Sequence, residues 1–82
     1  MPDQPYQPIA CADYDIYEIA IMQGRLLMLK WKVDSGEIFE QSVKPVKLEI
    51  KDGAEYLIFE SQGMQIIKTR LDKILYAEIV KK

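Results

Sequence analysis

The sequence contains no histidine and only one cysteine, Cys11. A single thiol cannot form an internal disulfide, and without a histidine the chain has neither a typical zinc-ligand set nor a base that could activate the thiol. A phosphate-binding glycine loop and a serine in a nucleophile-elbow setting are also missing. We therefore expect no enzyme activity, no cofactor and no metal ion, and we interpret Cys11 as a half-buried structural residue.

Long hydrophobic runs are absent as well. No apolar stretch approaches the roughly 20 residues that a membrane-spanning helix needs. The first residues, MPDQPYQPIA, have neither the basic start nor the apolar stretch of a signal peptide. We expect a cytoplasmic protein without membrane contact, and 82 residues are enough for one domain, 1–82, with a small core.

Basic residues are missing from the first 24 positions. This stretch carries a charge of −4, whereas residues 25–82 contain nine acids and eleven bases, a charge of +2. Acids near the start of a helix can simply favour the positive end of the helix dipole and keep the surface soluble. They can also form a surface that is unsuited to phosphates and suited to a basic partner. The charge alone leaves both interpretations open.

Residues 12–23 are predicted to form a helix after an extended, proline-rich arm at residues 1–8. Asp13 or Cys11 is placed to cap this helix, and Gly24 is placed to end it. A periodicity of 3.6 residues predicts a side that faces the domain, formed by Ile9, Ala12, Ile16, Ile19 and Ala20. The opposite side then carries Tyr14, Asp15 and Glu18, with Ile21 and Met22 next to them and Tyr17 at the edge.

Strand patterns follow over residues 26–80. Residues 26–33 and 37–43 predict a hairpin, and residues 55–61, 64–70 and 74–80 predict three further strands. Residues 44–53 contain Pro45 and Asp52-Gly53, and we interpret them as a connection with some extended character. One helix and about five antiparallel strands predict an α+β, mainly β fold, in which the helix packs on a small open barrel of Sm-like or SH3-like type.

The first predicted strand contains the run Lys30, Trp31 and Lys32, a cation–aromatic–cation combination that RNA-binding barrels use. Because side chains alternate along a strand, Trp31 points away from both lysines, and we interpret it as a core residue above a solvated lysine face. An Sm-like RNA-binding module is still an alternative function. A small adaptor that binds partners through the open edge of the barrel is another.

Four stretches carry a family resemblance: YQPIACADYDIYEIA, LLMLKWKVDSGE, EYLIFE and TRLDKI. Together they resemble the Rho-binding antiterminator family, the Rof or YaeO proteins of bacteria. The resemblance runs from Tyr6 to about Ile74 and weakens in residues 44–53. Its most specific part is the N-terminal arrangement of Tyr6, Pro8, Ile9, Cys11, Tyr14, Asp15 and Glu18.

The resemblance implies an inhibitor of the transcription termination factor Rho. Such a protein is expected to bind the N-terminal RNA-binding domain of Rho, to keep RNA off its primary site, and to act as a monomer that does not itself bind nucleic acid. By position, the resemblance implies that Pro8, Ile9 and Cys11 seat the arm on the barrel. It also implies a set of Rho-contacting residues: Asp13, Tyr14, Asp15 and Glu18, then Tyr17, and a secondary contact at Lys51 and Asp52.

Overall fold

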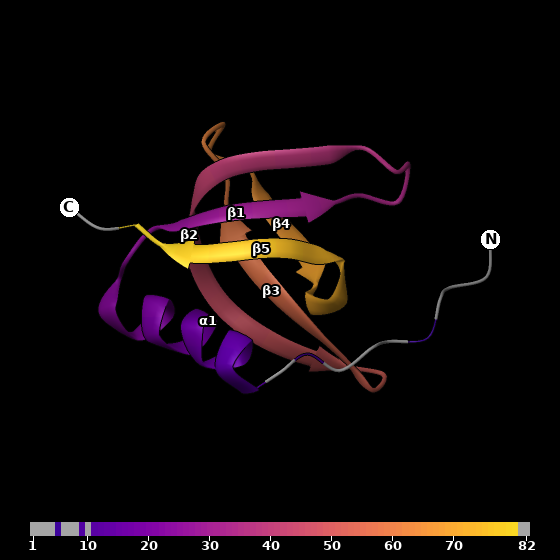
Figure 1. Ribbon diagram of the computed structural model, residues 1–82, viewed down its shortest axis with the longest axis horizontal. Coiled ribbons are helices and arrows are strands. Elements are labelled where there is room, and N and C mark those ends of the chain that lie inside the picture. The colour runs from indigo at the N-terminus through magenta and orange to yellow at the C-terminus, as the bar shows by residue number, and fades with distance from the viewer. Residues whose placement is uncertain (1–4, 6–8, 10, 81–82) are drawn as a thin grey trace.

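The computed structural model describes residues 5, 9 and 11–80. Over these residues the chain forms one α-helix, five strands and a short 3₁₀ turn (Figure 1): α1 (Cys11–Gln23), β1 (Leu27–Lys32), β2 (Ile38–Lys51), β3 (Ala54–Glu60), β4 (Ile66–Arg70), η1 (Leu71–Lys73) and β5 (Ile74–Ile79). Apart from Pro5, the predicted arm at residues 1–8 lies outside the described residues. None of the helices in the described part is long and apolar enough to cross a membrane.

The five strands form one antiparallel sheet in the order β4-β3-β2-β1-β5. Strands β4 and β5 are therefore its two edges, and the curved sheet stays open. The 3₁₀ turn η1 carries the chain from one edge to the other, and Leu71 within it is buried. The predicted α+β, mainly β class with a helix on an open five-stranded sheet is confirmed.

Strand β2 differs from the prediction, because residues 44–51 continue it and do not form a connection. Its first half pairs with β1 and its second half pairs with β3, with a register shift between Pro45 and Lys47. A bulge is a place where a strand tolerates proline, which has no N–H to give to the ladder. One long strand thus belongs to both halves of the curved sheet. Asp52 and Gly53, with φ of 52° and 79°, form the two-residue turn into β3.

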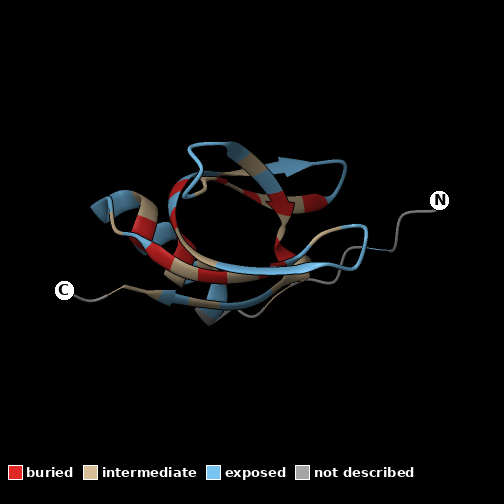
Figure 2. Ribbon diagram, turned by 90° about the horizontal axis from the view of Figure 1, so that it is seen from above, coloured by how far each residue is buried: buried red, intermediate tan, exposed pale blue. Residues whose placement is uncertain are grey.

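The core lies on the concave side of the sheet, where buried residues line the inside of the curve (Figure 2). Leu27, Leu29 and Trp31 of β1 all point into it, as the alternation predicted. The Trp31 ring meets the Phe59 ring edge-on at a centroid distance of 5.0 Å. Lys32, on the other face of β1, is exposed, and Lys30 is half-buried. Trp31 is therefore a core residue.

The end of α1 is fixed by Gly24, whose φ is 65°. The Gly24 N–H donates to the Ile21 carbonyl (3.3 Å) and the Arg25 N–H donates to the Ala20 carbonyl (2.8 Å), the two bonds of a Schellman motif. The Arg25 guanidinium then donates to the Val80 carbonyl at 3.1 Å. These bonds tie the exit of the helix to the end of β5.

The rotation of α1 differs from the prediction. The helix packs against β2 and β5, and among residues 13–23, whose burial is described, Tyr17 and Ala20 are fully buried, at 3% and 0% exposure. Ile19, predicted to face the core, is 40% exposed, so that prediction is wrong. Apolar residues occur on every side of this helix, and the aromatic ring of Tyr17 has more apolar surface to bury than Ile19.

The start of α1 also differs from the prediction. Because the helix begins at Cys11, Asp13 lies in its first turn and is not the capping residue. Ile9, just before the helix, is half-buried and packs against the core. Pro8 lies outside the described residues.

Candidate partner-binding surface on helix α1

Four exposed residues of α1 share one side of the helix. Asp15, Glu18, Ile19 and Met22 have the spacing i, i+3, i+4, i+7, which places them in one stripe. We call these four residues the outer face of α1. The inner side is formed by Tyr17 and Ala20, so the core holds the helix in a rotation that directs the outer face away from the sheet.

The carboxylates of α1 carry negative charge that the helix itself does not neutralise. Asp13, Asp15 and Glu18 are all exposed, and α1 contains no basic residue. Within the part of the chain that the structure describes, none of the three takes part in an ion pair. Their charge is therefore available to a basic group from outside the molecule.

Tyr14 connects this surface to the sheet. The side chain is half-buried and packs against the core. Burial raises the pKa of the Tyr14 hydroxyl, and the nearby carboxylates of Glu55 and Glu18 raise it further. Glu55, at the start of β3, thus adds negative charge beside the helix. No local pattern in the sequence indicates this proximity, because Glu55 is brought there by the packing of α1 on the sheet.

Tyr17 was expected at the edge of the exposed side and among the partner contacts. At 3% exposure it lies in the core, where burial and the charge of Asp13 raise the pKa of its hydroxyl to about 12. Its side chain cannot touch a partner without leaving the core. We therefore correct its placement and remove it from the candidate surface.

Lys51 and Asp52 are exposed at the β2–β3 turn. In Figure 1 this turn lies beyond the N-terminal end of α1 and not beside the outer face. The structure therefore brings Asp15 and Glu18 together, but it leaves Lys51 and Asp52 as a separate surface.

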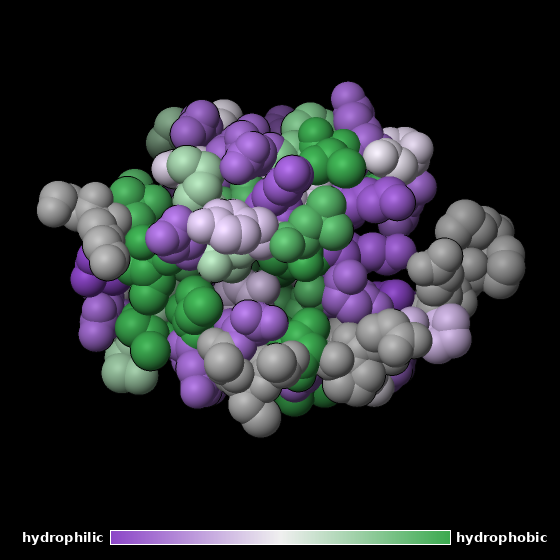
Figure 3. Space-filling view, viewed as in Figure 1, coloured by the Kyte–Doolittle hydropathy of each residue, from purple (hydrophilic) through white to green (hydrophobic). Residues whose placement is uncertain are grey.

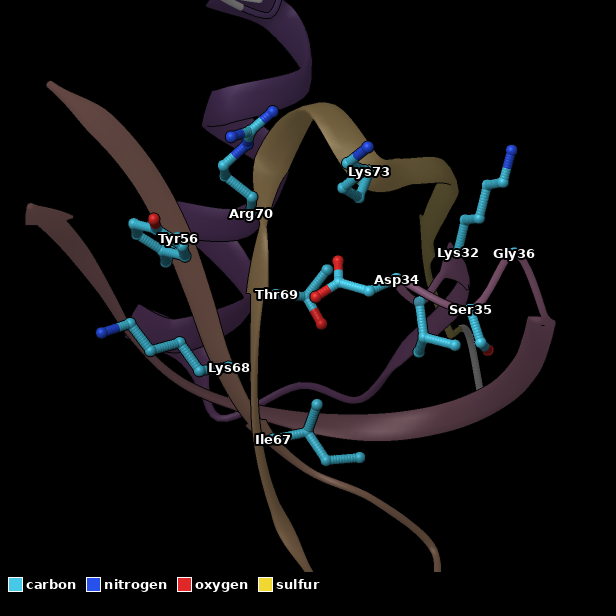
Figure 4. Close-up of a pocket in the computed structure, with 11 residues that line it drawn as sticks. Lys32, Asp34, Ser35, Gly36, Tyr56, Ile67, Lys68, Thr69, Arg70 and Lys73 are labelled. Atoms are coloured by element: carbon cyan, nitrogen blue, oxygen red, sulfur yellow. The ribbon is translucent and has the colours of Figure 1, made fainter. Parts of the chain in front are cut away.

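A cavity of about 530 Å³ lies between the β1–β2 turn and strand β4, and its lining includes Lys32, Lys68, Arg70 and Lys73. In Figure 4 the charged ends of Lys32, Lys68 and Arg70 are directed away from the middle of the cavity, whereas the Asp34 carboxylate is directed into it. Because basic residues line it, this cavity is the candidate site for the alternative function of direct RNA binding.

The cations of the cavity are partly neutralised by the protein itself. Lys68 Nζ lies 3.5 Å from a Glu49 carboxylate oxygen and 4.8 Å from the centre of the Tyr56 ring. The guanidinium of Arg70 donates two hydrogen bonds to the Asp72 carboxylate, at 2.8 and 2.9 Å. Their positive charge is thus less available to phosphates. Residues 11–80 contain no cluster of three or more acidic or cysteine side chains that could hold a metal ion.

Comparisons with known proteins agree with the resemblance seen in the sequence. The chain is 39% identical over 69 residues to Protein rof of Escherichia coli (strain K12) and to Protein rof of Shigella flexneri, and the match covers 84% of this chain and 76% of each relative. No protein-family model matches. Proteasome accessory factor B/C of Arthrobacter aurescens contains a similar fold, with a TM-score of 0.79 and 23% identity over 93% of this chain and 13% of that one. That likeness concerns the fold alone.

Proposed function

Since this chain belongs to the Rof family, we propose that it inhibits Rho-dependent transcription termination. It binds the N-terminal RNA-binding domain of Rho and blocks the access of RNA to the primary site. It acts in the cytoplasm, as a monomer in which residues 1–82 form one domain.

The observation that carries this proposal is the group of three exposed carboxylates on α1, which have no ion-pair partner among the described residues. A protein that binds single-stranded RNA presents Lys and Arg to the phosphates, together with aromatic platforms for the bases. Asp15 and Glu18 offer the opposite charge to those cations from the outer face, and Asp13, in the first turn, assists from another side of the helix. A complex through these groups would compete directly with RNA.

We assign the main contacts to Asp13, Tyr14, Asp15 and Glu18. Tyr14 adds a hydroxyl that can donate a hydrogen bond. Lys51 and Asp52 are proposed as a secondary contact, on the separate surface formed by the β2–β3 turn.

The test is the displacement of a fluorescent single-stranded RNA from purified Rho. The parent protein is compared with the double variant Asp15→Lys, Glu18→Lys. A second double variant, Glu37→Lys, Glu40→Lys, is the control, because it changes the net charge equally at two exposed positions of the β1–β2 hairpin. We expect the parent and the control to displace RNA and the α1 variant to be weaker by about 100-fold or more, since it places like charges against each other.

Two results would refute the proposal. One is displacement by the folded α1 variant as strong as that by the parent, which would move the contact away from α1. The other is neither displacement nor complex formation by the parent at high excess. In that case direct binding of the labelled RNA to this protein, weakened by Lys30→Glu, would support the alternative of an RNA-binding module.

A further inference from the structure

The outer face of α1 is apolar as well as acidic. Met22 is 80% exposed and Ile19 is 40% exposed, and both lie on the same stripe as Asp15 and Glu18. Hydrophobic atoms gather over the C-terminal half of α1, at the left of Figure 3. A helix side turned only to water needs no such residues, and neither Ile19 nor Met22 belongs to the core cluster, to which α1 contributes Tyr17 and Ala20.

The positions of these residues match a known way of binding. A helix that lies in a groove of a partner contacts it through residues spaced i, i+3, i+4, i+7. On α1 the first two of these positions are carboxylates and the last two are aliphatic or thioether side chains. The face therefore has an acidic half toward the helix N-terminus and an apolar half toward the C-terminus.

A surface that binds single-stranded nucleic acid has the complementary pair of chemistries. It presents cations to the phosphates and apolar or aromatic platforms to the bases. Carboxylates fit the cations, and a flexible methionine packs well against aromatic rings through its sulfur. The charge and the apolar character of the outer face thus fit the same kind of partner.

We propose that Ile19 and Met22 pack against the base-binding platforms of the RNA-binding surface of Rho, while Asp15 and Glu18 face the cations beside them. This inference rests on the proposed function and adds the apolar half of the contact to it.

A second copy of this chain is a poor occupant for the outer face. In a two-fold symmetric dimer the same patch meets itself. If the two helices pack antiparallel, the acidic half of one copy lies against the apolar half of the other, where Asp15 and Glu18 meet no basic residue of α1. Removing these carboxylates from water without a basic partner disfavours self-association through this face.

The experiment measures the rates at which this protein and Rho associate and dissociate at several salt concentrations. Met22→Gln is the test variant. Met64→Gln is its matched control, because Met64 is 79% exposed in the turn between β3 and β4. We expect Met22→Gln to weaken the complex about tenfold, mainly through faster dissociation, with an unchanged salt dependence. Asp15→Asn should instead slow association and reduce the salt dependence.

The outcomes separate this inference from the function on which it rests. If Met22→Gln binds like the parent while Asp15→Lys, Glu18→Lys loses binding, the apolar contact is refuted and the function stands. If the parent does not bind Rho, both fail. If the protein alone sediments as a dimer that Met22→Gln dissociates, the outer face is a self-interface and the inference is wrong.

Discussion

The buried hydroxyl of Tyr17 should make the protein less stable at alkaline pH. Burial, and next the charge of Asp13, raise its pKa from 10.0 to about 12 in the folded protein. In the unfolded chain the hydroxyl titrates near its ordinary value of about 10. The folded state therefore holds the proton more tightly, so this contribution to stability is complete below pH 10 and is lost as the pH rises from 10 towards 12.

The magnitude follows from the difference between the two pKa values. Each pH unit in this window removes up to about 1.4 kcal/mol of unfolding free energy. Between pH 9 and pH 11 the loss due to Tyr17 should be about 1.3 kcal/mol. The variant Tyr17→Phe keeps the ring in the core and removes the titrating group, so it should not show this loss.

Urea unfolding followed by the fluorescence of the buried Trp31 measures the effect at a series of pH values. The other tyrosines and the lysines titrate in both proteins, so their contributions cancel in the difference between parent and variant. Equal losses of stability in the two proteins from pH 9 to pH 11 would show that the Tyr17 hydroxyl is solvated in the folded state, contrary to its 3% exposure. Because Tyr17 lies in the core, Tyr17→Phe should also displace RNA from Rho as the parent does.

Four further substitutions, one of them a control, test the packing. Asp72→Ala should lower the free energy of unfolding by about 2 kcal/mol, since it leaves the Arg70 guanidinium, 15% exposed, without this carboxylate. Gly24→Ala should lower the free energy of unfolding by about 1 kcal/mol, measured by thermal unfolding, because the φ angle of Gly24 is 65°. Gly63→Ala is the control and should be nearly neutral, since a Cβ there meets only the Ser61 hydroxyl at 3.8 Å. Trp31→Phe should lower the free energy of unfolding by less than about 2 kcal/mol. The buried indole N–H has no hydrogen-bond partner among the described residues, so its removal offsets part of the lost packing. A loss above about 4 kcal/mol would contradict this reasoning.

The alternation of β1 was readable from the sequence because a strand with one buried face repeats every two residues. Leu27, Leu29 and Trp31 lie in the core, as this period predicts. The continuation of β2 was missed because Pro45 is a local signal against a strand. Residues 44–51 pair with β3 across the two-residue turn Asp52-Gly53, so the Asp-Gly pair that was interpreted as part of a connection is the signal of a hairpin.

The acidic character of α1 was also predictable, since it depends only on the absence of basic residues in that stretch. The positions of individual side chains were not. Tyr17 and Ile19 exchanged roles relative to the prediction, because periodicity cannot decide a rotation when apolar residues occur on all sides. Glu55 was missed for a different reason: it reaches Tyr14 only through the tertiary packing of the helix.

The ambiguity in the helix pattern follows from the function proposed for the outer face. A helix that only covers a core carries apolar residues on one side, and its rotation can be read from the sequence. A helix that covers a core and also binds a partner through an apolar contact carries apolar residues on two sides. Its sequence therefore departs from the pattern of a single apolar stripe at the residues that bind the partner. Ile19 and Met22 are exposed, and the core is filled without them. In our proposal these two residues serve the complex and not the fold, and so they can change with the partner while Tyr17 and Ala20 keep the helix in place.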